Sequence, residues 1–248
     1  MLSIHSHAER PELENQKWSS RVNLPEFLFH AVGPDDIPAR LLRDFPEFQL
    51  YCCDGEELVG IAHSIPIKWN GTDDGLPAGW TEALELGLQR NATATDLAAL
   101  RVDIRRDRQR QGYSRVALRA LRRLARVHGL AHLIAPVRAS LKSRYPLTAL
   151  ERYVKWETEE GEPFDPWIRV HTRDGGHIAH VAPRSVSFRA SVADWEAWTG
   201  MRFPETGEYI VEGALAPVSI DCERDLGTHV EPGVWVVHDA LPDGEEAS

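Results

Sequence analysis

Apolar positions recur along the chain with two periods, one typical of strands and one typical of helices. Residues 48–53 and 58–69 are strand-like runs, and Asp54-Gly55 between them is a pair typical of tight turns. We therefore expect a hairpin there. Residues 97–104 and 130–137 are two further apolar runs of strand length.

Helical spacing lies between and around these runs. From about 112 to 128 the apolar residues fall on one stripe and Gly129 follows, so we expect a long amphipathic helix. That stripe comprises Val116, Ala117, Ala120, Leu121, Leu124 and Val127. Shorter helices are predicted over 34–45, 80–88, 165–175 and 191–200, and Asp165 and Pro166 suit the N-cap and first position of the third.

The last part of the chain returns to strand patterns, at 177–188, 216–223 and 234–238. Hairpins mixed with helices favour an α+β fold over a doubly wound sheet. We divide the chain into a polar N-terminal arm (1–20), one domain (21–240) and a disordered tail (241–248).

Composition narrows the class of protein. The chain has 248 residues, 42% of them hydrophobic, and no run approaches the length of a membrane span. The first residues do not read as a secretory signal, and Cys52, Cys53 and Cys222 form no metal or disulfide pattern, so we expect reduced thiols and a cytoplasmic protein. The net charge of −10 disfavours general nucleic-acid binding.

The segment 101–126 departs from this acidic balance, because it holds ten arginines and only two aspartates. Gly112 lies within it, where an apolar strand gives way to the long helix. Backbone N–H groups at a helix start bind anions, and a glycine allows a phosphate to approach closely. Neither GxxxxGK[ST] nor GxGxxG occurs in the chain, so a P-loop and a dinucleotide fingerprint are excluded.

This arrangement resembles the acyl-donor site of the GNAT-type N-acyltransferase superfamily, whose signature is Arg/Gln-x-x-Gly-x-Gly/Ala between a strand and a helix. Here the motif is Gln109-x-x-Gly112-x-Ser114, with serine in place of the last small residue. The resemblance covers roughly residues 25 to 190. It implies a mixed, mostly antiparallel central sheet flanked by helices. Two features depart from a minimal member of the family, an insertion at 139–164 and a C-terminal extension at 190–240.

The resemblance also implies a function, namely transfer of an acyl group from a pantetheine thioester, acyl-CoA as co-substrate, to a small amine by direct attack. The donor would lie on the backbone of Val102 and Ile104, and its pyrophosphate on Gln109, Arg110, Gln111, Gly112, Tyr113 and Ser114. The family often carries a tyrosine four residues before a glycine of a later helix, and His171 takes that position before Gly175. An imidazole can donate or accept the required proton, and Tyr145 is the competing acid.

Residues for the acceptor side are less defined by pattern. His63, Trp69 and Glu82 are candidates for binding the amine, and Glu82, Glu85 and Asp103 are candidate bases. His177 and His180, three residues apart on a predicted strand, point to opposite faces, so we expect no metal.

Three alternatives remain open at this point. An acidic acyl carrier protein could supply the thioester and dock on the 101–126 arginines, which would place the enzyme in a biosynthetic pathway. The chain could instead be a non-catalytic acyl-CoA-binding module. Aminoacyl-tRNA as donor is disfavoured by the overall charge. The insertion and the extension shape the acceptor side or form a homodimer contact.

Overall fold

A computed structural model describes residues 2–16, 24–30, 36–89 and 93–241, and the predicted tail at 242–248 lies outside them. Its strands form one nine-stranded sheet with the order β1-β2-β3-β4-β5-β9-β8-β7, and β6 pairs with β9 off this path. The strands are β1 (Leu2–Ser6), β2 (Gln49–Asp54), β3 (Glu57–Ile67), β4 (Asp96–Ile104), β5 (His132–Val137), β6 (His177–Ala190), β7 (Gly207–Tyr209), β8 (Val218–Asp221) and β9 (Leu226–Asp239). All pairings are antiparallel except β4 with β5.

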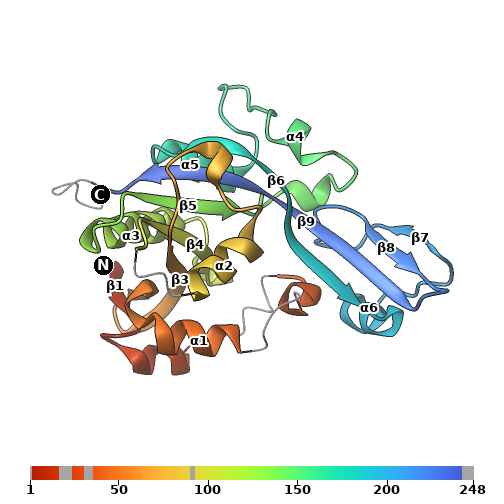
Figure 1. Cartoon of the computed structure of the whole chain (residues 1–248), viewed down its shortest axis with the longest axis horizontal. Coiled ribbons are helices and arrows are strands. Elements are labelled where there is room, and N and C mark those ends of the chain that lie inside the picture. The colour runs from red at the N-terminus through yellow and green to blue at the C-terminus, as the bar shows by residue number, and fades with distance from the viewer. Residues whose placement is uncertain (1, 17–23, 31–35, 90–92, 242–248) are drawn as a thin grey trace.

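Helices cover both faces of this sheet (Figure 1). They are α1 (Ile37–Asp44), α2 (Trp80–Leu88), α3 (Tyr113–Val127), α4 (Leu150–Tyr153), α5 (Pro166–Arg173) and α6 (Val192–Thr199). α3 and α5 bury their apolar sides against one face, and α1 and α2 bury theirs against the other. The expected α+β architecture is confirmed, and no described helix is long and apolar enough to cross a membrane.

The local signals for the helices are borne out. The Asp165 carboxylate accepts hydrogen bonds from the N–H groups of Trp167 and Ile168, and Pro166 occupies the first turn of α5. Ser191 caps α6 in a reciprocal capping box. In α3 one detail of the predicted stripe is wrong, because Val127 is 74% exposed while Arg122 is buried.

The prediction of a polar N-terminal arm is corrected at its start. Leu2–Ser6 forms β1, which pairs antiparallel with β2 and is an edge strand of the sheet. β9 is much longer than the predicted 234–238. Its second half pairs with β5, while its first half leaves the core and pairs with β8.

The extension continues the same sheet along β6 and β9, which run out of the core to the right in Figure 1 and carry β7, β8 and α6. It has its own apolar cluster, to which Phe27 from the N-terminal segment contributes beside Phe188 and Trp195. The segment 24–30 therefore joins the extension to the rest of the domain. The register of β6 against β9 shifts twice, and Pro183 lies in the second shift, between Ala182 and Val186.

Candidate active site

The parallel strands β4 and β5 part soon after they meet. Only Leu97 with Leu133 and Ala98 with Ile134 are paired, although both strands continue beyond these residues. The register of β4 against β3 shifts between these pairs and Arg101, which makes Leu100 the extra residue of a bulge. A bulge bends its strand and increases the twist, so the remainder of β4 turns away from β5 and leaves an opening in the sheet.

The backbone of Val102 and Ile104 faces this opening. The Arg105 N–H donates to the Val59 carbonyl at 2.9 Å, and in an antiparallel ladder such pairs alternate. Asp103 therefore turns its backbone groups toward β3, and the two residues beside it turn theirs to the other side. The Gln109 amide donates to the Ile104 carbonyl at 3.2 Å, in agreement with this direction.

The start of α3 lies at the end of the same strand. Gly112 is its N-cap with φ of 80°, Arg110 has φ of 64°, and no side chain caps the helix. Left-handed residues in such a turn direct successive N–H groups into a concavity that binds anions, and the helix dipole adds to it. Arg110 is exposed beside this turn with no partner among the described residues. The loop 109–114 therefore has the features of a phosphate site.

Other arginines of this segment have a structural role that the sequence did not indicate. The Asp174 side chain is fully buried, and Arg115, Arg119 and Arg122 bond to its two oxygens at 3.2, 2.6 and 2.8 Å. Burial opposes ionisation, but the three guanidiniums outweigh it and lower the pKa of Asp174. The proposed carrier-docking surface is corrected at these positions, because the three side chains tie α3 to the end of α5.

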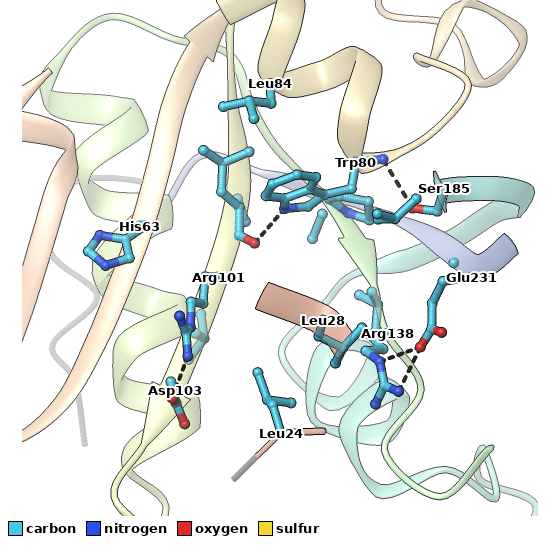
Figure 2. A pocket seen from close by; sticks show the side chains of 18 of the residues that line it. Leu24, Leu28, His63, Trp80, Leu84, Arg101, Asp103, Arg138, Ser185 and Glu231 are labelled. Atoms are coloured by element: carbon cyan, nitrogen blue, oxygen red, sulfur yellow. Dashed lines mark hydrogen bonds and ion pairs between the residues drawn. The ribbon is translucent and has the colours of Figure 1, made fainter. Parts of the chain in front are cut away.

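One continuous pocket of about 1500 Å³ is lined by the strand opening, by the start of α3 and by the side of the extension that includes Phe188 and Trp198. A single small-molecule site usually occupies ~300–1,000 Å³. The pocket is thus large enough for two substrates side by side. Figure 2 shows one part of this pocket. β3 and β4 lie on one side of it, with Arg101 and Asp103, and Arg138 and Glu231 lie on the opposite side.

Trp80 lies above this part of the pocket (Figure 2). Its indole N–H donates to the Leu100 carbonyl at 2.7 Å, and its backbone N–H donates to the Ser185 hydroxyl at 3.0 Å. A Cβ at Gly79 would lie 2.2 Å from the Ser185 Cα, so glycine is needed where α2 starts against β6. The bulge, α2 and the extension are in this way fixed to one another.

His63 lines the pocket from β3, directly across the strand pair from Arg101. The buried Gln49 amide donates to the Phe45 and Ser64 carbonyls at 2.9 and 3.0 Å, so its oxygen faces His63 Nδ1, at 3.0 Å. His63 Nδ1 must therefore carry a proton, and in the neutral ring the lone pair is on Nε2. The ring can accept a proton at that atom.

His171 also lines the pocket, but it is almost completely buried. Its Nδ1 lies 2.9 Å from His238 Nε2, and its own Nε2 has no partner among the described residues. Burial and the neighbouring His238 hold the pKa of His171 well below its usual value. The ring is therefore neutral near pH 7, and its Nε2 is buried inside the pocket wall.

Three of the predicted catalytic and acceptor residues lie outside the pocket, and Gln111 and Gly112 of the predicted donor loop are not in its lining either. Tyr145 packs in an aromatic cluster of the insertion, edge-on against Trp156 and Phe164 and tilted against Tyr153. Trp69 is a core residue whose indole donates to the Thr72 carbonyl at 2.9 Å. The Glu82 carboxylate accepts the Ala78 N–H at 2.5 Å in front of α2. None of them is part of the pocket wall, so neither the competing acid nor these two acceptor contacts has support in the geometry.

The sequence did not indicate Gln49, Arg138 or Glu231. A charged Glu231 within the apolar run of β9 was the available signal for the last of them. No group of three potential metal ligands occurs in the ranges that the structure describes.

A divided pair of parallel strands beside an uncapped helix start is the arrangement expected for the donor site of a GNAT-type acyltransferase. The chain belongs to the GNAT-type N-acyltransferase superfamily and is an acyltransferase. It is 32% identical over 208 residues to the arginine N-acetyltransferase avaD of Aspergillus versicolor, a match that covers 74% of this chain and 71% of that protein. No family model matches the chain.

Two solved structures show the same fold. The loading GNATL domain of CurA from Lyngbya majuscula superposes with a TM-score of 0.59 at 17% identity, covering 97% of this chain and 98% of that one. The GphF GNAT-like decarboxylase in complex with isobutyryl-CoA gives 0.57 at 15% identity, covering 97% and 100%. At these identities the likeness concerns the fold alone.

Proposed function

We propose that this protein transfers an acyl group, most simply acetyl, from acyl-CoA to a nitrogen of arginine or a compound that contains it. The observation that carries the proposal is the opening between β4 and β5, which shares one pocket with the uncapped start of α3. The similarity to an arginine N-acetyltransferase supports the acceptor class.

The donor would lie with its pantetheine along Val102 and Ile104, whose backbone groups face the opening. Its pyrophosphate would accept hydrogen bonds from the N–H groups of the loop 109–114, and Arg110 adds a charge-assisted contact. The Val102 N–H is the donor within the strand that can stabilise the oxyanion on the thioester carbonyl.

The acceptor nitrogen would approach from the side of His63. As it attacks the thioester carbon, the C–N bond forms, and the C–S bond breaks with its electron pair remaining on sulfur. The proton of the nitrogen passes to His63 Nε2, the atom that the contact with Gln49 leaves unprotonated. His171, neutral in the pocket wall, is the residue predicted from the sequence to contact the sulfur, and its buried Nε2 would have to become accessible when the donor binds.

The direct test is a reaction of the purified protein with acetyl-CoA and arginine, with lysine and putrescine as comparison amines. Thiol release and the mass of the product are recorded together. Arginine-dependent thiol release with one added acetyl group would support the proposal. Tight binding of acetyl-CoA without transfer to any amine would favour a non-catalytic module. Transfer only from an acylated carrier protein would replace the donor.

A further inference from the structure

The wall of the pocket opposite His63 contains a charged group that the transfer chemistry does not use. Arg138 follows the last residue of β5, and its Nε and Nη2 lie 2.6 Å from one oxygen of Glu231 on β9. The other oxygen of Glu231 lies 2.5 Å from His229 Nε2. Arg138 Nη2 also donates to the Gly213 carbonyl at 2.5 Å.

The carboxylate in this group is inaccessible to a ligand, whereas the guanidinium is accessible. Glu231 is 2% exposed, and the Arg138 side chain is 30% exposed and lines the pocket. Burial works against ionisation of Glu231, but Arg138 and His229 outweigh it and lower the pKa of the carboxyl. The acid is therefore ionised near pH 7 and holds the guanidinium from behind.

A guanidinium has five N–H donors. Glu231 and Gly213 take those of Nε and Nη2, and the two of Nη1 have no partner among the described residues. Nη1 is also absent from the buried unpaired atoms of the described chain, so it is accessible within the pocket. Two N–H donors on a fixed cation are suited to an anionic oxygen.

The surroundings restrict which ligand can use these donors. Figure 2 shows Trp80 above the space between Arg138 and Arg101, Leu28 within that space beside Arg138, and Leu24 below it. Arg101 donates to Asp103 at 2.9 Å on the far side. A ligand whose amine lies near His63 would present its opposite, anionic end toward Arg138.

We propose that Arg138 binds the carboxylate of the acceptor, so that the acceptor class is a free amino acid rather than a simple amine. The inference rests on the proposed function. Glu231 and His229 act as positioning residues for the guanidinium. The contact of Arg138 with Gly213 couples this end of the pocket to the C-terminal extension.

The experiment compares arginine with agmatine, which has the same guanidine and chain but no carboxylate. Wild type, Arg138→Gln and Arg138→Lys are measured in kcat/KM for both compounds and in calorimetric titrations. A hydrogen bond to a charged group is worth roughly ten- to a hundredfold in affinity, so Arg138→Gln is expected to reduce the preference for arginine over agmatine by that factor. The loss should appear in KM, and Arg138→Lys should restore part of it.

Arg173→Gln is the matched control, because Arg173 also pairs with a glutamate but lies on the surface outside the pocket. It should leave the preference unchanged. If Arg138→Gln loses kcat/KM equally for arginine and agmatine, Arg138 has only a structural role and the inference is overturned. A wild type that does not prefer arginine over agmatine would overturn it as well. Preferential binding of arginine without turnover would refute the proposed function and leave the carboxylate site in place. If neither compound binds, both proposals fail.

Discussion

Asp174 provides a sharp test of how this fold is held together. Its side chain has no exposed surface and receives bonds from three arginines of α3. Asp174→Asn keeps the size of the side chain but removes its charge, and it leaves the cations of Arg119 and Arg122 without a counterion in a partly buried site. Loss of one partner of a buried ion pair costs about 3–5 kcal/mol, and the preserved amide places this variant near the lower limit.

For a domain of this size 1 kcal/mol shifts the melting temperature by roughly 2–4 °C, so a loss of 3 kcal/mol corresponds to about 6–12 °C. The measurement is urea and thermal unfolding followed by circular dichroism at pH 7. Glu162→Gln is the control, because Glu162 pairs with Arg173 at the surface. It should unfold together with wild type.

The pH dependence has a definite sign. The pKa of Asp174 is lowered in the folded state, so its contribution is complete above the unfolded value of ~3.9 and is lost as the pH falls toward the folded value. Wild type should therefore lose more stability than Asp174→Asn below pH 4. A variant that unfolds with wild type at pH 7, or that shows the same acid sensitivity, would refute the structural assignment of these arginines.

Three further outcomes are expected. Gly112→Val should raise the Kd for coenzyme A about tenfold or more, because charge-assisted bonds to phosphate contribute about 1.5–3 kcal/mol. Gly129→Val is the control, because Gly129 also has a left-handed backbone but lies at the far end of α3, and it should leave the Kd unchanged. Both Kd values are measured by calorimetry, and equal effects would contradict the loop assignment. His171→Gln should lower kcat more than donor affinity, and its kcat should keep the wild-type pH profile between pH 6 and 8 because burial already lowers the pKa of the native ring; loss of an inflection that wild type shows in this range would argue against the neutral form. Cys222 is exposed and Cys52 is buried with its pKa raised to about 12, so the native protein should expose one fast-reacting thiol to a disulfide reagent, which Cys222→Ser removes; two fast thiols would contradict this packing.

The sequence predicted those parts of the molecule that short-range physics determines. Asp165 with Pro166, and Gly112 at a strand–helix junction, each act within a few residues. The same locality made the anion loop recognisable, because its N–H groups come from consecutive residues.

Contacts between distant residues could not be predicted in this way. Arg138 and Glu231 are 93 positions apart, and the pairing of β5 with β9 brings them together. Asp174 meets Arg122 only through the packing of α5 on α3. Tyr145 was mistaken for an acid because a tyrosine in an insertion can face either the site or its own aromatic neighbours, and periodicity does not distinguish these orientations.

The pairing of β5 with β9 has a consequence for how the protein acquires its activity. Ala135 pairs with Val236, so the intervening chain, which includes α5 and the whole of the extension, must close into a loop before this wall exists. Contacts of such high sequence separation form late, whereas the β2–β3 hairpin and α3 need only neighbouring residues. A refolding chain would therefore form the loop 109–114 before the wall that contains Arg138 and Glu231.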